Sequence, residues 1–284
     1  MSFQFQSFPA PAKLNLLLHV VGKRADGYHL LETVFRFIDF GDTLEIAARG
    51  DGMIELLTPT DGVPAEQDLT VRAARLLQRE SGCALGASIR LDKRIPMGGG
   101  LGGGSSDAAT VLIALNRLWG LGWPRERLQA LSLHLGADVP VFIFGRSALA
   151  TGVGEVLAPI ALQPAWYLVI HPQVHVPTAA IFRNFSQSML TEVGVDGIMR
   201  ILETTQQRRN DLQNVVSGMF PAVNEVLSEL RKYGSPLMTG SGACVFMEFK
   251  SKDEADKVYR VLSEKYQGFV AQGLDVHPLF DSAE

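Results

Sequence analysis

The sequence is poor in cysteine, in net charge and in long apolar runs, and each scarcity excludes a class of protein. Cys83 and Cys244 are the only cysteines in 284 residues, which excludes a disulfide framework and argues against a structural zinc site. This cysteine usage suits a reducing cytoplasm. A net charge of −4 creates no extended field for nucleic acid or an anionic membrane, so we expect neither as a partner.

No apolar run approaches the roughly 18 residues of a membrane span, and residues 1–6 lack the basic-then-apolar order of a signal peptide. With 46% hydrophobic residues, the chain can bury a large core as one big or two modest domains. These properties predict an ordinary globular protein.

Glycine, by contrast, is concentrated in one place. Residues 95–109 read IPMGGGLGGGSSDAA, with six glycines in seven positions. Glycine leaves no Cβ in the way, so several backbone amides can close on one anion. Apolar residues then recur at helical spacing, and the helix dipole adds its positive end. The segment predicts a phosphate cradle, with Ser105 or Ser106 as the helix N-cap.

Other glycine-rich designs fit this segment less well. A P-loop needs lysine and then Ser/Thr after its second glycine, whereas two serines follow Gly104. The dinucleotide pattern G-x-G-x-x-G can be drawn through Gly98, Gly100 and Gly103, but about ninety residues precede it, and it should open the first βαβ unit. A flexible linker seldom runs into a capped amphipathic helix.

The hydrophobic pattern predicts an α+β fold. In the first part, strands are expected at residues 13–20, 32–39, 43–48, 53–57 and 88–91, and helices at 69–80, 105–118 and 125–135. Strand-rich stretches precede the helices, which favours a mixed sheet over a doubly wound one. The proline-containing segment 157–164 predicts a domain boundary, giving domains 1–160 and 161–284.

The second part predicts a βαββαβ order once some irregular helices are set aside. Its expected strands are 166–170, 236–238, 244–249 and 268–276, and its expected helices are 221–233 and 252–266. Ser251 and Glu254 form a capping box for the second helix. This order is the split-βαβ, ferredoxin-like arrangement.

Two pairs of polar residues near the N-terminus could carry chemistry. Lys13 and Asn15 share the less apolar face of the first strand, where a solvated face is the ordinary interpretation. Tyr28 and His29 follow a turn, where a surface turn with a partly buried tyrosine is the ordinary one.

Two further segments lie later in the chain. Asp138 stands before an apolar run. It could be an ordinary turn residue or a positioned base. Residues 239–246 form a second glycine turn that enters a strand, as a plain hairpin also would.

Together these segments resemble the GHMP kinases, the small-molecule kinases of galactose, homoserine, mevalonate and phosphomevalonate. Residues 96–109 look like the family's phosphate motif and residues 239–246 like its C-terminal glycine motif, and the match covers nearly the whole chain. The resemblance implies two domains, the first like domain 2 of ribosomal protein S5 and the second ferredoxin-like, with the active site in the cleft between them. It also implies ATP as phosphate donor, with Mg²⁺.

The resemblance assigns roles to matching positions. Asp138 would be the catalytic base that takes the acceptor's hydroxyl proton, and Lys13 would orient Asp138 and balance charge. The implied ATP-binding residues are Lys93, Pro96, Met97, Gly98, Gly99, Gly100, Leu101, Gly102, Gly103, Gly104, Ser105 and Ser106.

Segments 9–16, 24–29 and 136–140 resemble those members whose acceptor is a cytidine diphosphate sugar-alcohol of isoprenoid biosynthesis, phosphorylated on the 2-hydroxyl of its methylerythritol unit. The resemblance places the cytosine between Tyr28 and Phe182. His29 would read its edge. The other implied acceptor-binding residues are Asn15, Thr178, Gly240, Ser241 and Gly242.

Two positions depart from the expected pattern. Asp68 stands where an asparagine often faces the adenine, and Asp107 where some members have asparagine. Because a carboxylate would repel phosphate, we expect Asp107 to serve the helix N-terminus or Mg²⁺ instead. The alternatives to this acceptor are a GHMP kinase for another small alcohol and a non-catalytic nucleotide-binding relative. A monomer or weak homodimer is expected.

Overall fold

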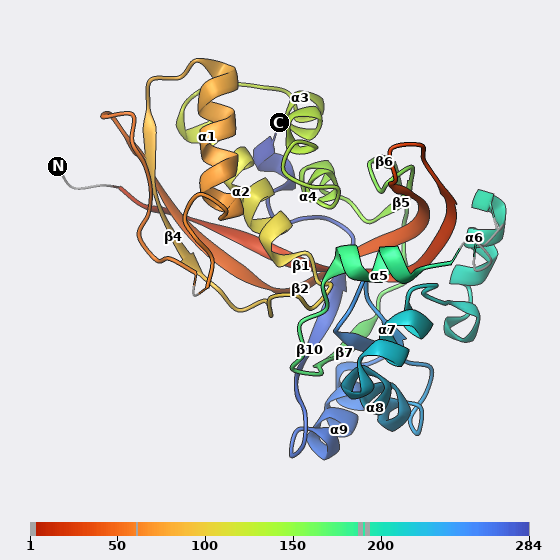
Figure 1. Ribbon diagram of the computed structural model, residues 1–284. Coiled ribbons are helices and arrows are strands. Elements are labelled where there is room, and N and C mark those ends of the chain that lie inside the picture. The colour runs from red at the N-terminus through yellow and green to blue at the C-terminus, as the bar shows by residue number, and fades with distance from the viewer. Residues whose placement is uncertain (1–3, 61, 187–189, 191–193, 284) are drawn as a thin grey trace.

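Two long antiparallel strands run through the protein. The computed structural model describes residues 4–60, 62–186, 190 and 194–283 (Figure 1). In it, β1 (Gln6–Lys23) and β2 (His29–Arg49) pair along most of their lengths, with register shifts in β1 that let the pair twist. β1 is buried on both faces from residue 10 to residue 20, so Lys13 and Asn15 lie in the interior and not on a solvated face.

The first part of the chain builds a mixed sheet, as predicted. The strand β4 (Gly86–Asp92) pairs antiparallel with β2 and parallel with β3 (Ile54–Leu56). β2 is continuous where the sequence predicted two strands. The short strands β5 (Ala148–Thr151) and β6 (Val156–Pro159), which were not predicted, extend the sheet beyond β2.

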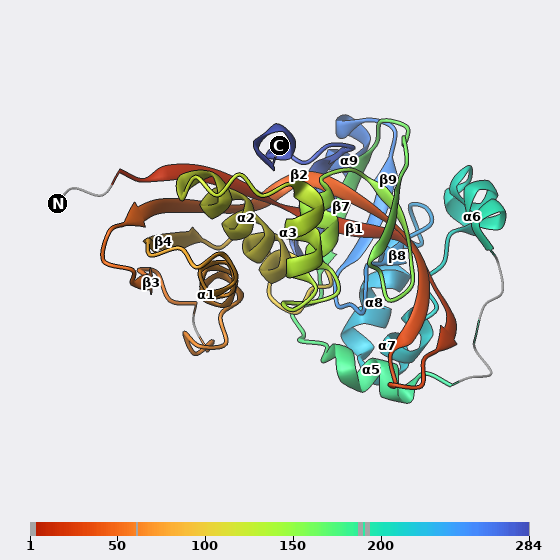
Figure 2. The same cartoon turned by 90° about the horizontal axis from the view of Figure 1, so that it is seen from above.

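Four helices cover one face of this sheet (Figures 1 and 2). They are α1 (Leu69–Ser81), α2 (Gly103–Leu118), α3 (Arg125–Ser132) and the unpredicted α4 (Val139–Phe144). α2 is buried for most of its length, and its apolar side chains share a core with α1, β2 and β4.

The predicted serine cap of α2 is wrong. The N-cap is Gly102, whose left-handed backbone (φ 74°) starts the helix before the two serines. No side chain caps the helix there. Ser106 Oγ donates to the carbonyl of Pro11 at 2.7 Å, which ties the first turn of α2 to β1. The helix therefore begins with amides that no side chain occupies.

The second part is the predicted ferredoxin-like arrangement. Its sheet has the order β10 (Gln267–Leu274), β7 (Trp166–His171), β9 (Val245–Phe249) and β8 (Leu237–Met238), all antiparallel. The helices α8 (Pro221–Leu230) and α9 (Lys252–Leu262) pack on it and share one core. The Ser251 cap of α9 is confirmed, since Ser251 Oγ accepts from the amide of Glu254. The remaining elements are α5 (Thr178–Asn184), α6 (Gly194–Leu202), η2 (Thr205–Gln207), α7 (Gln213–Met219) and η3 (Phe280–Ala283).

The two sheets are joined. β10 pairs with β7 along one edge and with β2 through Gly273–Ile38 and Leu274–Phe37 on the other. The predicted domain boundary falls between β6 and β7, and the division into domains stays a prediction because the sheet runs through both parts.

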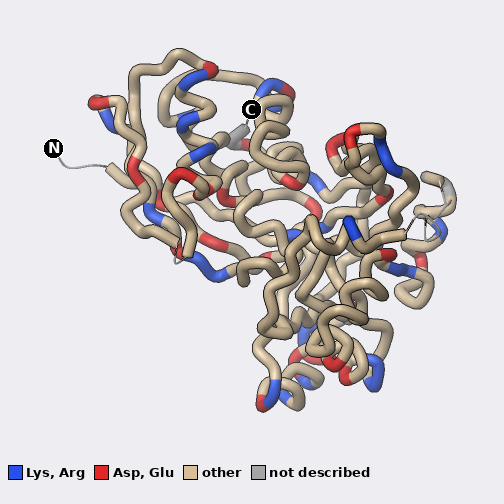
Figure 3. Tube along the Cα trace, viewed as in Figure 1, with Lys and Arg blue, Asp and Glu red and all other residues tan. Residues whose placement is uncertain are grey.

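Along the chain, basic and acidic residues are interspersed in both parts (Figure 3). No helix in the described part of the chain is both long and apolar enough to cross a membrane.

Candidate active site

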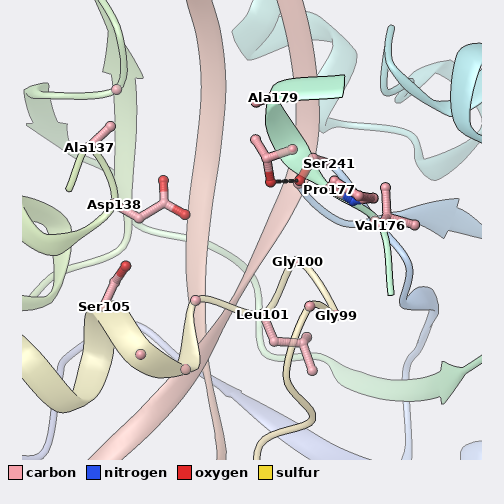
Figure 4. Close-up of a pocket in the computed structure, with 18 of the residues that line it drawn as sticks. Gly99, Gly100, Leu101, Ser105, Ala137, Asp138, Val176, Pro177, Ala179 and Ser241 are labelled. Atoms are coloured by element: carbon pink, nitrogen blue, oxygen red, sulfur yellow. Dashed lines mark hydrogen bonds between the residues drawn. The ribbon is translucent and has the colours of Figure 1, made fainter. Parts of the chain in front are cut away.

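A cavity of about 1150 Å³ lies where the glycine loop meets the turn after β8 and the start of α5. Every predicted site residue lines it except Ser106, which is fully buried and turned toward Pro11. In Figure 4, Asp138 and Ser241 lie on opposite sides of this space, and Gly99 and Gly100 lie below Ser241. The fold thus brings together segments from both ends of the sequence.

The glycine loop is held by backbone contacts. The amides of Ala243 and Cys244 donate to the carbonyls of Gly98 and Gly99 at 3.1 and 3.0 Å. A Cβ on Gly100 would lie 2.2 Å from the Thr239 carbonyl oxygen, and the φ of Gly100 is +74°. The two glycine motifs therefore pack main chain against main chain, which only residues without a side chain allow.

At the first turn of α2, Lys13 and Asp138 meet. Lys13 Nζ lies 3.2 Å from Asp138 Oδ2, and the two side chains are 2% and 39% exposed. A Cβ on Gly102 would lie 3.1 Å from Lys13 Cε, so the lysine sits directly against the helix N-cap. The ammonium also faces the ring of Phe35 at 5.2 Å. A buried cation thus lies between the anion cradle and a cavity-facing carboxylate.

Asn15 holds this lysine in place. Its Oδ1 accepts from Lys13 Nζ at 2.5 Å, and its Nδ2 donates to Thr33 Oγ1 at 2.8 Å. Its backbone amide donates to Thr239 Oγ1 at 3.0 Å. Asn15 lines the cavity, but its amide group is engaged by protein partners. Thr33, which the sequence did not single out, and Thr239, the first residue of the second glycine turn, complete the network.

Lys93 lies between two buried aspartates. Its Nζ contacts Asp42 and lies 2.9 Å from Oδ2 of Asp107. Burial lowers the pKa of Lys93, but the two carboxylates together raise it above its ordinary value. Burial also raises the pKa of Asp107, to about 8, against the attraction of Lys93. The cation that faces Asp107 is thus Lys93. The expected role of this aspartate toward the helix N-terminus or Mg²⁺ stays a prediction.

Asp42 and Asp68 also have structural partners. Asp42 Oδ1 accepts from the amides of Arg94 and Ile95 at 2.6 and 2.7 Å, fixing the entry to the glycine loop. Asp68 is the N-cap of α1 and accepts from the amide and hydroxyl of Thr70. Asp68 lines the cavity.

At the acceptor end the site is built from side chains. Tyr28 is 63% exposed. The His29 ring stacks on Phe182 with centroids 5.0 Å apart and an interplanar angle of 26°. His29 thus covers one face of Phe182, the ring against which the resemblance places the cytosine. Burial, and then the charge of Lys23, lower the pKa of His29. Thr178 Oγ1 and Ser241 Oγ lie 2.7 Å apart and bridge α5 to the second glycine turn.

Asn210 was missed by the sequence interpretation. Its Nδ2 donates to the carbonyls of Met238 and Gly240 at 2.8 and 2.7 Å, and its Oδ1 accepts from the amide of Leu212. The side chain is 5% exposed. Asn210 therefore fixes the main chain of the second glycine turn. The two carbonyls that it holds lie about thirty residues away in sequence, so no local pattern reveals this role.

Close relatives of the chain carry one name. The 4-diphosphocytidyl-2-C-methyl-D-erythritol kinase of Chromobacterium violaceum is 85% identical over 284 residues, which are 100% of both chains. The protein of that name from Nitrosospira multiformis is 58% identical over 281 residues, covering 98% of this chain and 94% of its own.

Solved structures agree in fold. The crystal structure of 4-(cytidine 5'-diphospho)-2C-methyl-D-erythritol kinase has a TM-score of 0.83 at 36% identity, covering 94% of this chain and 99% of that one. Homoserine kinase from Cytophaga hutchinsonii has a TM-score of 0.73 at 16% identity, covering 98% of each chain, and shows the fold alone.

Family models match both parts of the chain. The one described as GHMP kinases N terminal domain matches residues 68–146, which hold the glycine loop and Asp138. The one described as GHMP kinases C terminal matches residues 195–268. With its glycine loop on α2 and its ferredoxin-like second part, the chain belongs to the GHMP kinase family.

Proposed function

We propose that the protein transfers the γ-phosphoryl group of ATP to the 2-hydroxyl of 4-diphosphocytidyl-2-C-methyl-D-erythritol, a step of non-mevalonate isoprenoid synthesis. The observation that carries the chemistry is the Lys13–Asp138 contact of 3.2 Å beside the N-cap of α2. The names of the close relatives support the choice of acceptor. A non-catalytic relative would have no need of this charge pair inside the cavity.

The donor end is the glycine loop. Phosphoryl transfer asks little covalent chemistry of the protein, so alignment and neutralisation of the phosphate oxygens dominate. The free amides at the start of α2 and the helix dipole suit the phosphates, since no side chain caps them. Lys13, whose side-chain carbons pack against Gly102, adds a positive charge where negative charge develops.

The acceptor hydroxyl meets Asp138. As its oxygen forms a bond to the γ-phosphorus, the bond from that phosphorus to the β,γ-bridging oxygen breaks and ADP leaves with the electron pair. The hydroxyl proton passes to a carboxylate oxygen of Asp138. Lys13 keeps this carboxylate oriented, and Asn15 keeps Lys13 in place.

Mg²⁺ accompanies ATP in this proposal. Within the described residues, no cluster of three or more His, Cys, Asp or Glu side chains could hold a metal ion. Two cavity-lining carboxylates are already engaged, Asp68 as a helix cap and Asp107 by Lys93. Mg²⁺ is commonly held by phosphates and water with few protein ligands. The site therefore fits an ion that enters bound to ATP and neutralises its phosphate oxygens.

The acceptor is tested by ADP release with ATP, Mg²⁺ and a panel of alcohols. We expect turnover with the cytidine diphosphate compound and poor turnover with methylerythritol phosphate, homoserine and mevalonate. Binding energy from the distant cytidine helps to align the hydroxyl, so its loss lowers kcat as well as affinity. Equal efficiency with methylerythritol phosphate would overturn the acceptor and leave the kinase class standing.

We further propose that the enzyme works in the cytoplasm as a monomer or weak homodimer. Light scattering over a range of protein concentrations would test the oligomeric state, and a stable dimer at every concentration would contradict it.

A further inference from the structure

Beneath the glycine loop lies a buried ionic triad whose two aspartates have no part in the proposed chemistry. It consists of Lys93, Asp42 and Asp107, and the side chains of the two aspartates are 0% and 3% exposed. One ammonium and two carboxylates carry a net charge of −1 when all three are ionised. A net negative charge under an anion cradle opposes the binding of phosphate.

The two carboxylates are not equivalent. Asp42 receives two backbone amides on Oδ1 and Lys93 on Oδ2, and each of these donors favours its charged form. Asp107 receives Lys93 on Oδ2, whereas its buried Oδ1 has no hydrogen-bond partner. Burial and the negative charge of Asp42 raise the pKa of Asp107 to about 8, against the opposing charge of Lys93. A proton added to the triad therefore goes to Asp107.

The triad adjoins the expected position of the phosphates. Gly103 is the first residue of α2, and a Cβ there would lie 2.8 Å from Lys93 Nζ. Lys93, Gly103 and Asp107 all line the cavity. Phosphates bound in the loop would place several negative charges next to the triad, in a region of low dielectric where such charges interact strongly.

Among the residues that the structure describes, no other charged group compensates Asp107. On β1, Lys13 is paired with Asp138, which precedes α4. Asp68, the N-cap of α1, carries a negative charge and accepts a hydrogen bond from the amide of Thr70. The charges that act on Asp107 are therefore those of Lys93 and Asp42.

We propose that ATP bound in the glycine loop holds Asp107 in its protonated form, so that in alkaline solution, where the free protein has lost this proton, binding takes one up from solvent. The neutral carboxyl leaves Lys93 with Asp42 as its anionic partner and brings the triad to zero net charge. The step forms one O–H bond and needs no other reactant. It rests on the proposed ATP site, and it makes Asp107 a nucleotide-coupled proton site instead of a phosphate ligand.

The direction of the pH dependence follows from linkage. Below about pH 8 Asp107 is already protonated in the free protein, so ATP affinity is level there. Above about pH 8 the free protein loses this proton while the complex keeps it, so affinity falls by up to about tenfold per pH unit. The phosphates of ATP are fully ionised in that range and add no proton of their own.

Calorimetry of the full chain with a non-hydrolysable ATP analogue and Mg²⁺ tests the proposal. Titrations at about pH 8.5 in two buffers of different ionisation enthalpy count the protons taken up. We expect about 0.5–1 proton per analogue bound, and a Kd that rises about five- to tenfold between pH 8 and pH 9. In Asp107→Asn, whose amide has the shape of the neutral carboxyl, the proton uptake should vanish. The Kd of this variant should change by less than about twofold between pH 8 and pH 9.

Asp68→Asn is the matched control, because it neutralises another buried carboxylate of the same cavity and should keep the proton uptake. Binding without uptake in the natural sequence would overturn the proposal, and that measurement does not depend on any variant folding. Uptake that persists in Asp107→Asn would also overturn it, by assigning the proton elsewhere. Failure of the analogue to bind at all would instead contradict the ATP site itself.

Discussion

Glycine has different surroundings at the two ends of the cavity. At the donor end, a Cβ on Gly100 would lie 2.2 Å from a carbonyl oxygen of the second glycine turn. At the acceptor end, Gly27 also has a positive φ, +91°, but a Cβ there would meet nothing within 4 Å. Main chain packed on main chain forms one end, and side-chain rings, among them the exposed Tyr28, form the other.

The difference matches what each end has to recognise. The phosphates of ATP are the same for every kinase of the fold, so a rigid backbone cradle serves them all. The acceptor differs between kinases, and side chains can be exchanged without disturbing the main chain. Substitutions at the donor end should therefore damage ATP binding and stability together, and those at the acceptor end should change acceptor affinity alone.

The largest effect is expected where the two ends meet, at Asp138. Asp138→Asn should lower kcat by about 10²- to 10⁴-fold, the usual contribution of a positioned general base, while both KM values change little. This loss corresponds to a rise of roughly 3–5 kcal/mol in the activation free energy. Steady-state kinetics on both substrates would measure it, with Asp253→Asn on the surface of α9 as control. Near-normal turnover would show that alignment alone suffices.

A second prediction compares the two glycines directly. Gly100→Ala meets both an unfavourable φ and a backbone clash, so it should raise the KM for ATP more than about tenfold and destabilise the protein by more than about 2 kcal/mol. Gly27→Ala meets the unfavourable φ only and should cost about 1–2 kcal/mol with no change in the KM for ATP. Thermal unfolding and ATP kinetics of the pair measure this. Equal damage from both would remove the distinction between the two ends.

The smallest effect is expected for one exposed ring. Tyr28→Ala should raise the KM for the cytidine diphosphate acceptor by about two- to twelvefold, since stacking contributes about 0.5–1.5 kcal/mol beyond area burial. The KM for ATP should stay unchanged. Tyr28→Phe, which keeps the ring, serves as the control and should behave like the natural sequence. Damage confined to ATP binding would place Tyr28 at the wrong end.

The donor end was predictable from sequence because its signal is local. Six glycines in seven positions run into an apolar helical pattern, and all the residues that form the cradle are neighbours in the chain. The helix at residues 69–80 was predicted nearly to its observed bounds, Leu69–Ser81, for the same reason. The order of strands and helices along the second part, βαββαβ, was likewise predictable from the local hydrophobic pattern.

What the sequence could not provide are contacts between distant segments. Asp42 meets Lys93 fifty-one residues later, and His29 stacks on Phe182 across more than 150 residues. Neither contact produces a spacing within one element. The start of α2 was misplaced because a serine cap is the usual choice, whereas here a left-handed glycine begins the helix.

The pairing of β10 with β2 has a consequence for how the chain folds. Gly273 and Ile38 are separated by most of the sequence, so this contact closes a very long loop. Contacts of such separation form slowly, and we expect the seam between the two sheets to be among the last structures to appear. Until then the short stretch of β2 between its pairings with β5 and β4 stays open to pairing with another chain. Refolding yield should therefore fall as protein concentration rises, even if both halves acquire their helices quickly.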